Sequence, residues 1–163
     1  MTDNGDEPLL DFYGVPGHLI RVCKQKSSYF FALMCREHGI TPIQYAVLKL
    51  LAMRPDIDQL ELADLAALDS STAGDVVLRL CQRGLLERRP EGRRQCLRLA
   101  PAGEALLEEV TPLVAASQEH VLAPLTKRER AQLLRLMSKM TGTRNRHHTP
   151  SRRAGARNWR GGS

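Results

Sequence analysis

Arginines are the side chains best suited to chemistry in this chain, and many of them cluster. Residues 70–100 hold seven arginines against three acids, whereas residues 1–140 as a whole balance at 18 basic and 18 acidic groups. Clustered arginine is the electrostatic footprint of a polyanion such as a nucleic acid. We therefore interpret six of these arginines as phosphate contacts, with a solvated charged face as the alternative: Arg79, Arg83, Arg88, Arg93, Arg94 and Arg98.

Three short hydroxyl side chains precede the arginine cluster. Ser70, Ser71 and Thr72 are expected on the first turn of a helix, where hydroxyls and backbone amides meet phosphates or base edges. Capping of the helix alone is the alternative. Asp75 follows, and it would either accept a hydrogen bond from a cytosine amino group or orient Arg79 one turn on. This arrangement favours a surface that binds double-stranded DNA.

Two short helices and a hairpin are predicted to position these side chains. The helices are expected over residues 58–67 and 70–83, and Gly84 ends the second. Residues 85–89 and 95–99 are expected as strands around a turn at 90–94. This order is typical of a winged helix-turn-helix, whose second helix enters the major groove while the hairpin reaches the backbone or the minor groove. The side chains expected to pack the two helices together are Leu60, Val76, Val77 and Leu80.

Four further helices are predicted around this module. Apolar spacing and the Gly, Pro and Thr residues at their ends place them over residues 16–38, 42–53, 102–122 and 126–140. Pro112 predicts a kink or a break in the helix over 102–122. The side chains of the helix over 42–53 that are expected to point inward are Ile43, Ala46, Val47, Leu50 and Leu51.

The predicted fold class is therefore mainly α with a small β-hairpin wing (α+β). We expect a flexible acidic arm over residues 1–15, a winged-helix domain with dimerisation helices over 16–140, and a disordered basic tail over 141–163. The DNA-binding core of that domain is expected over 42–100. The outer helices carry more apolar surface than the small module can cover, so a homodimer is the simplest expectation and a monomeric bundle the alternative.

Composition excludes several classes of protein. The sequence contains no run of about 18 apolar residues, so no membrane span is expected. The acidic N-terminus lacks the layout of a signal peptide, so a cytoplasmic location is expected. The four cysteines form no CxxC pair and are expected as free thiols. No catalytic constellation, phosphate-binding glycine loop or metal-ligand spacing is present, so we expect neither an enzyme nor a cofactor.

Residues 16–140 resemble the MarR family of transcriptional regulators. The family's properties imply a homodimer whose first and last helices interlock and whose two winged domains straddle a pseudopalindromic site. Two positions depart from the family pattern: Gly74-Asp75 stand where a Thr-Arg pair is frequent, and Glu91-x-Arg93 stands for Asp-x-Arg. Arg93 or Arg94 would be the minor-groove arginine. The segments that carry the resemblance are Gly39–Tyr45, Leu62–Leu65, Ser71-Thr72, Arg83–Arg88, the arginine-rich turn and Leu99–Gly103.

Gly17–Arg21 and Gly74–Val77 also resemble a branch of the family that controls the breakdown of aromatic carboxylates such as hydroxylated nicotinic acids. In the family the effector pocket lies between the dimer layer and the winged domain. The resemblance therefore implies a small aromatic effector, a carboxylate or a phenol, held by His18 and Arg21 with Tyr45 as an aromatic wall. The alternatives are intersubunit salt bridges for His18 and Arg21, and a core position for Tyr45.

Two other functions remain open from the sequence. The first is a redox-sensing regulator switched by oxidation of Cys23, whose thiol pKa Lys24 and Lys26 would lower. The second is a non-specific DNA-binding or architectural protein, which would show a steep salt dependence and no preferred site. A ligand-responsive repressor is the first hypothesis, and the effector, the operator and the choice between repression and activation do not follow from the sequence.

Overall fold

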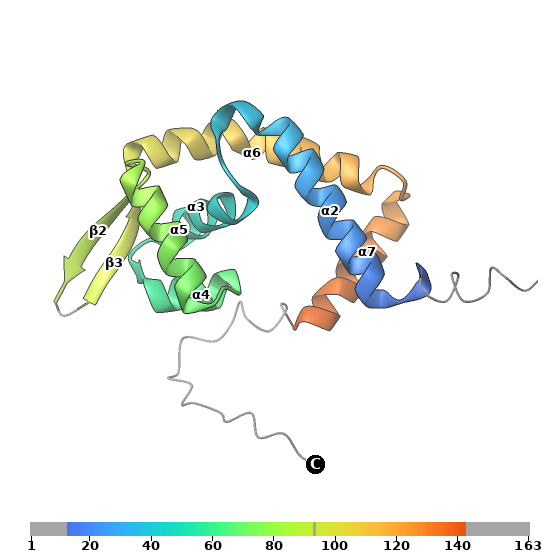
Figure 1. The fold of residues 1–163 in the computed structure, drawn as a ribbon, viewed down its shortest axis with the longest axis horizontal. Coiled ribbons are helices and arrows are strands. Elements are labelled where there is room, and N and C mark those ends of the chain that lie inside the picture. Colours follow the sequence, from blue (N-terminus) through green and yellow to red (C-terminus); the bar gives the residue numbers. More distant parts are fainter. Residues whose placement is uncertain (1–12, 93, 143–163) are drawn as a thin grey trace, which may run out of the picture. The chain divides into compact units, whose positions relative to one another are not determined.

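The computed structural model describes residues 13–92 and 94–142. They fall into two compact units, one up to Pro124 and one from Leu125. The expected arm up to residue 12, Arg93 and the expected basic tail from residue 143 lie outside the described residues. The predicted fold class is confirmed. The elements in chain order are α2 (Pro16–Met34), η1 (Arg36–His38), α3 (Pro42–Met53), β1 (Ile57–Asp58), α4 (Gln59–Ala66), α5 (Ser70–Gln82), β2 (Leu86–Glu91), β3 (Arg94–Leu99), α6 (Pro101–Leu122) and α7 (Lys127–Thr141) (Figure 1).

The wing is an antiparallel hairpin of β2 and β3 that extends away from helices α4 and α5 (Figure 1). Its turn is tighter than predicted, because Pro90 pairs with Gln95 and Glu91 pairs with Arg94. Gly92 has a φ of 60°, which a hairpin turn favours and which glycine adopts without a steric penalty. The strand β2 lies at the edge of the sheet, where a proline without an N–H is tolerated.

A third strand, β1, was not foreseen. Ile57 pairs with Leu97 and Asp58 pairs with Cys96, so the sheet has the order β1-β3-β2. Two residues are too few to show alternation in a sequence. The pairing nevertheless fixes the start of α4 beside the wing.

The N-terminal caps of the central helices are local and follow the sequence. The Thr41 hydroxyl accepts a hydrogen bond from the amide of Gln44, and the Thr41 amide donates to the side chain of Gln44, a capping box at the start of α3. The carboxylate of Asp58 accepts from the amide of Glu61 at 2.9 Å. Asp69 does the same for α5. These caps begin the two helices of the helix-turn-helix where the sequence predicted.

The first helix is shorter than predicted. It ends at Met34, and residues 36–38 form a separate 3-10 turn that Gly39 closes in the left-handed conformation, with a φ of 56°. The break divides the predicted helix over 16–38 into a long helix and a corner that leads into α3.

The core of the first unit lies between α3, α4, α5, the sheet and α6. Its fully buried side chains include Leu48, Leu62, Leu80, Leu97 and Val110. Leu48 was missed, because the buried stripe of α3 runs through residues 44, 47, 48 and 51 instead of through 43 and 46.

Two further expectations about the core are wrong. Ile43 and Ala46 are exposed, and Leu60, expected to join α4 to α5, is 70% exposed. In α4 the inward positions are Leu62 and Ala63, and Leu60 lies nearly opposite Leu62 around the helix.

Helix α6 is continuous through Pro112, so of the predicted kink or break the break is wrong. The missing N–H of a proline removes one helical hydrogen bond. Pro112 is exposed, as is Glu108 four residues earlier, whose carbonyl loses that donor. At the residue directly before the proline, the Thr111 hydroxyl donates to the carbonyl of Leu107 at 2.6 Å. Among the described residues, no helix has the length and apolar character needed to cross a membrane.

Candidate nucleic-acid interface

Helix α5 presents one face to the core and the opposite face outward. Ala73, Val77 and Leu80 are fully buried against the core. At 3.6 residues per turn, the outward stripe falls on residues 71, 75, 78, 79 and 82, and all five are exposed. Leu78 lies in the middle of this stripe and is 51% exposed. Leu78 was not among the predicted contact residues, although its position opposite the apolar Leu80 on the same helix indicates an outward side chain.

The first turn of α5 combines two of the predicted roles. Thr72 donates to Asp69 from its amide at 2.9 Å and from its hydroxyl at 2.6 Å, and it is half-buried. The hydroxyl contact with Thr72 is the first cause that lowers the pKa of Asp69. The Thr72 hydroxyl is therefore part of the cap, whereas Ser70 and Ser71 are exposed on the same turn.

Asp75 and Arg79 both point outward from α5. Within residues 13–92 and 94–142, neither side chain has a hydrogen-bond or ion-pair partner. Asp75 does not orient Arg79, which removes one of the two interpretations of this carboxylate. Both groups are available to an external partner.

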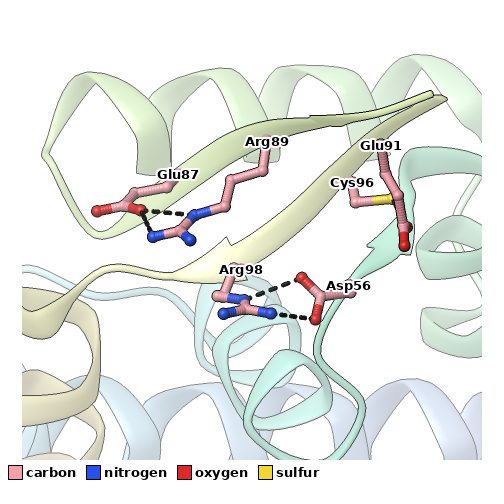
Figure 2. Close-up of polar contacts among 6 residues, drawn as sticks. All are labelled: Asp56, Glu87, Arg89, Glu91, Cys96 and Arg98. Carbon is pink, nitrogen blue, oxygen red and sulfur yellow. Dashed lines mark hydrogen bonds and ion pairs between the residues drawn. The ribbon is translucent and has the colours of Figure 1, made fainter. Parts of the chain in front are cut away.

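Most arginines of the wing are paired with acids of the same chain. Arg94 forms an ion pair with Asp58, and its Nε donates to the same carboxylate at 3.1 Å. Arg98 forms an ion pair with Asp56, with Nε 2.9 Å from Oδ1 (Figure 2). Arg89 lies 3.2 Å from Glu87 (Figure 2). The excess positive charge counted along the sequence is therefore partly neutralised within the wing and by Asp56 and Asp58.

The contacts of Arg98 and Arg94 lower the pKa of the two aspartates that they bind. The hydrogen bond from the Arg98 side chain is the main cause that holds the pKa of Asp56 below its usual range. For Asp58 the amide of Glu61 is the first cause and Arg94 the second, and both lower its pKa. Both acids thus stay charged to lower pH than an isolated aspartate.

Gln59 lies between α5 and the wing. Its Oε1 is 3.5 Å from the guanidinium of Arg88, and a Cβ added to Gly74 would meet its Nε2 at 3.3 Å. A larger residue at position 74, such as the family's threonine, would have to displace this side chain. The departure from the family pattern at Gly74 therefore coincides with a neighbour that fills the space.

Arg83 is the C-cap of α5, and its side chain is hydrogen-bonded within the chain. Its Nη1 donates to the carbonyl of Gly39 at 2.8 Å, and its Nη2 donates to the carbonyl of His38 at 3.2 Å. The predicted phosphate ligand is thus already engaged with the corner between η1 and α3.

The three predicted effector residues do not meet within one chain. An Arg21 nitrogen lies 3.3 Å from Nδ1 of His18, so these two side chains are neighbours on α2. Tyr45 is half-buried and packs against Phe31, with ring centroids 6.2 Å apart. His18 and Phe31 are 13 residues apart along one helix, which corresponds to roughly 20 Å. Within a single protomer, therefore, Tyr45 lies apart from the His18–Arg21 pair.

The cysteines differ in exposure. Cys23 is exposed on α2, whereas Cys35 and Cys96 are buried. Burial raises the pKa of the Cys35 thiol, and the hydrogen bond from Cys96 to Glu91, at 3.2 Å, is the first cause that raises the pKa of Cys96 (Figure 2). No group of three or more His, Cys, Asp or Glu side chains in the described parts of the chain is arranged to hold a metal ion.

Known proteins are similar to this chain in sequence and in fold. The profile of the MarR family matches residues 38–95. The transcriptional repressor NicR of Pseudomonas putida is 30% identical over 127 residues, which cover 76% of this chain and 80% of that protein. The transcriptional regulator HosA of Escherichia coli is 30% identical over 107 residues, or 64% of this chain and 79% of HosA.

Solved structures agree. A probable transcriptional regulator from Pseudomonas aeruginosa superposes with a TM-score of 0.76 at 32% identity, over 79% of this chain and 98% of that one. BpsR of Bordetella bronchiseptica, whose DNA binding is regulated by 6-hydroxynicotinic acid, gives 0.75 at 28% identity, over 79% and 96%. PcaV of Streptomyces coelicolor, in complex with its natural ligand, gives 0.71 at 30% identity, over 89% and 100%. The chain belongs to the MarR family of winged helix-turn-helix transcriptional regulators, which bind DNA as dimers and are not enzymes.

Proposed function

We propose that this protein is a repressor that binds a pseudopalindromic operator as a homodimer and is released from it by a small aromatic carboxylate or phenol. The observation that carries the proposal is the outward face of α5, where Asp75, Leu78 and Arg79 project together. An α-helix with such a face fits the major groove of B-DNA. The proposal places the protein in the cytoplasm with the DNA that it regulates.

Each side chain of this face has a distinct task in the proposal. Asp75 accepts a hydrogen bond from a cytosine amino group, and Leu78 packs against thymine methyl groups. Arg79 contacts a phosphate, and Ser70 and Ser71 bind phosphate or base edges at the first turn, beside the capped Thr72.

The wing supplies contacts to the backbone and the minor groove. Arg88 has only a long contact, 3.5 Å, to Gln59 and is available to a phosphate. Arg93 remains the proposed minor-groove residue. Arg94 would have to exchange its ion pair with Asp58 for a phosphate.

The dimer is supported by apolar side chains that the single chain leaves exposed. On α2 they are Leu19, Ile20, Tyr29 and Leu33, and in the second unit they include Leu134, Met137 and Met140 on α7. Helix α7 has no buried residue. Self-complementary pairing through a two-fold axis covers such surfaces in two identical chains at once, whereas a monomeric bundle would have to cover them within one chain.

Effector binding is assigned to the N-terminal part of α2. Arg21 would hold the carboxylate, with His18 beside it as a second polar group. Tyr45 would contribute only to a site that includes another part of the dimer. The chemistry of the effector follows the relative BpsR, which responds to 6-hydroxynicotinic acid. An effector shifts DNA affinity only if it binds the two conformations of the dimer differently.

The test is fluorescence anisotropy with a labelled duplex from the gene's own upstream region, and a scrambled duplex of equal length as control. Specific binding that 6-hydroxynicotinate or another aromatic acid weakens at constant salt supports the whole proposal. Binding that no aromatic acid alters refutes the effector half alone. Equal affinity for both duplexes refutes the sequence-specific repressor and leaves the architectural alternative.

A redox switch is the second candidate, and it rests on the exposure of Cys23. An accessible thiol can be oxidised by peroxide, whereas buried cysteines are protected. If peroxide releases the wild-type protein from its operator but not the Cys23→Ser variant, the switch is established. An equal response of the two proteins removes it.

A further inference from the structure

The C-terminal end of α5, the proposed recognition helix, is hydrogen-bonded to a segment far away in the sequence. Arg83 follows α5 and donates to two consecutive carbonyls, those of Gly39 at 2.8 Å and His38 at 3.2 Å. A guanidinium presents several N–H groups in a rigid fork, so one side chain can bind two acceptors in a fixed geometry. The contact spans 44 and 45 residues of sequence.

The segment that Arg83 binds is itself a corner held by other elements. Gly39 closes η1 with a left-handed backbone, directly before the capping box of α3. Nε2 of the His38 ring lies 3.5 Å from a carboxylate oxygen of Glu109 on α6. The corner of residues 38–39 therefore meets α5 through Arg83, α6 through Glu109, and α2 through the chain itself.

We infer that Arg83 is a positioning residue, which fixes the recognition helix to the corner of residues 38–39 and does not contact a phosphate. This inference rests on the proposed function. Turning the guanidinium toward DNA would give up both hydrogen bonds and detach the end of α5 from the corner. Arg79, one turn earlier on the same helix and without a partner among the described residues, contacts DNA instead.

The two roles differ in how affinity depends on salt. Each phosphate contact releases counterions and contributes about 0.9 to the slope of log affinity against log salt concentration. A dimer that loses one such contact in each protomer therefore has a slope flatter by about two units. Loss of a positioning residue lowers the affinity by a similar factor at every salt concentration, because no counterion release is lost.

The experiment compares Arg83→Met with Arg79→Met, a matched pair that removes one charge from neighbouring turns of one helix. Operator affinity of the full chain is measured from about 50 to 300 mM salt. We expect Arg79→Met to flatten the slope by about two units. We expect Arg83→Met to keep the wild-type slope and to bind about tenfold more weakly throughout. Arg83→Met with a slope flattened like that of Arg79→Met, or with unchanged affinity, overturns the inference.

A charge-preserving variant and a measurement without DNA complete the test. Arg83→Lys keeps the charge that a phosphate needs but cannot donate to both carbonyls through a planar fork, so we expect it to remain close to Arg83→Met. Wild-type affinity in Arg83→Lys contradicts the inference.

Hydrogen exchange of the free protein reports the attachment directly. Amides of residues 36–41 and of the last turn of α5 should exchange faster in Arg83→Met than in the wild type, and at the wild-type rate in Arg79→Met. Unchanged exchange in Arg83→Met contradicts the attachment whatever the DNA result. If the wild-type protein has no preferred duplex but the exchange result holds, the proposed function fails and the attachment survives.

Discussion

Among the glycines of residues 13–92 and 94–142, Gly103 leaves the least room for a side chain, at the point where α6 follows the wing. Gly103, in the first turn of α6, packs against the backbone of Leu85, just before β2. A Cβ added to Gly103 would lie 2.1 Å from the carbonyl oxygen of Leu85 and 3.1 Å from its carbonyl carbon. That oxygen also accepts a hydrogen bond from the amide of Ala100 at 3.1 Å. Gly103→Ala therefore forces a helix away from the segment that leads into the wing.

Two opposing effects decide the magnitude. Replacing a helical glycine by alanine lowers the entropy of the unfolded chain and contributes roughly 0.4–1 kcal/mol of stability. The added methyl requires a displacement of roughly 1 Å between two backbone segments in a close-packed interior. Overpacking typically costs about 1–3 kcal/mol, and here no flexible side chain can move aside, so the upper end applies. The expected net loss in the free energy of unfolding is about 2 kcal/mol.

The assay is urea unfolding followed by circular dichroism at equal protein concentration, since the stability of a dimer depends on concentration. Gly17→Ala is the matched control, because Gly17 lies in α2 with nothing within 4 Å of an added Cβ. We expect the control to gain roughly 0.5 kcal/mol. A Gly103→Ala variant as stable as the wild type, or stabilised like Gly17→Ala, refutes the reasoning.

Three further predictions concern single positions. In Asp58→Asn the free energy of unfolding should fall less at acid pH than in the wild type. The reason is that the lowered pKa of Asp58 contributes stability above about pH 4, which is lost as the pH falls further. Acid titrations followed by circular dichroism check this, and identical curves for the two proteins contradict it. Replacing operator thymines by deoxyuridine should weaken wild-type binding by about 0.8 kcal/mol, roughly fourfold, for each methyl that Leu78 touches. The Leu78→Ala variant should not distinguish the two duplexes, and a loss equal to that of the wild type rules out the contact. Ala67→Gly should raise the free energy of unfolding by about 0.5–1 kcal/mol, since Ala67 ends α4 with a left-handed φ of 53°; a lower urea midpoint would contradict it.

Features set by neighbours in the sequence were predictable. The caps at Thr41, Asp58 and Asp69 and the left-handed Gly39 and Gly84 depend on residues within one helical turn, and all of them appear where the sequence predicted. They are sufficient to place the helix-turn-helix and the wing.

Contacts between distant segments were not predictable from local patterns. Asp56 and Asp58 reach the arginines of the wing across 42 and 36 residues, and Arg83 reaches Gly39 across 44. Counting charges along the chain therefore does not reveal which arginines already have partners within the protein. The strand β1 and the inward turn of Leu48 likewise depend on what packs against them.

The ion pairs that join the wing to Asp56 and Asp58 also bear on how the proposed repressor searches a genome. Acids that occupy Arg94 and Arg98 reduce the attraction of the winged module to any arbitrary stretch of DNA. Most chromosomal sites compete only through that attraction. We therefore expect few dimers to be sequestered away from the operator, so that a small number of molecules per cell is enough to keep the target gene silent.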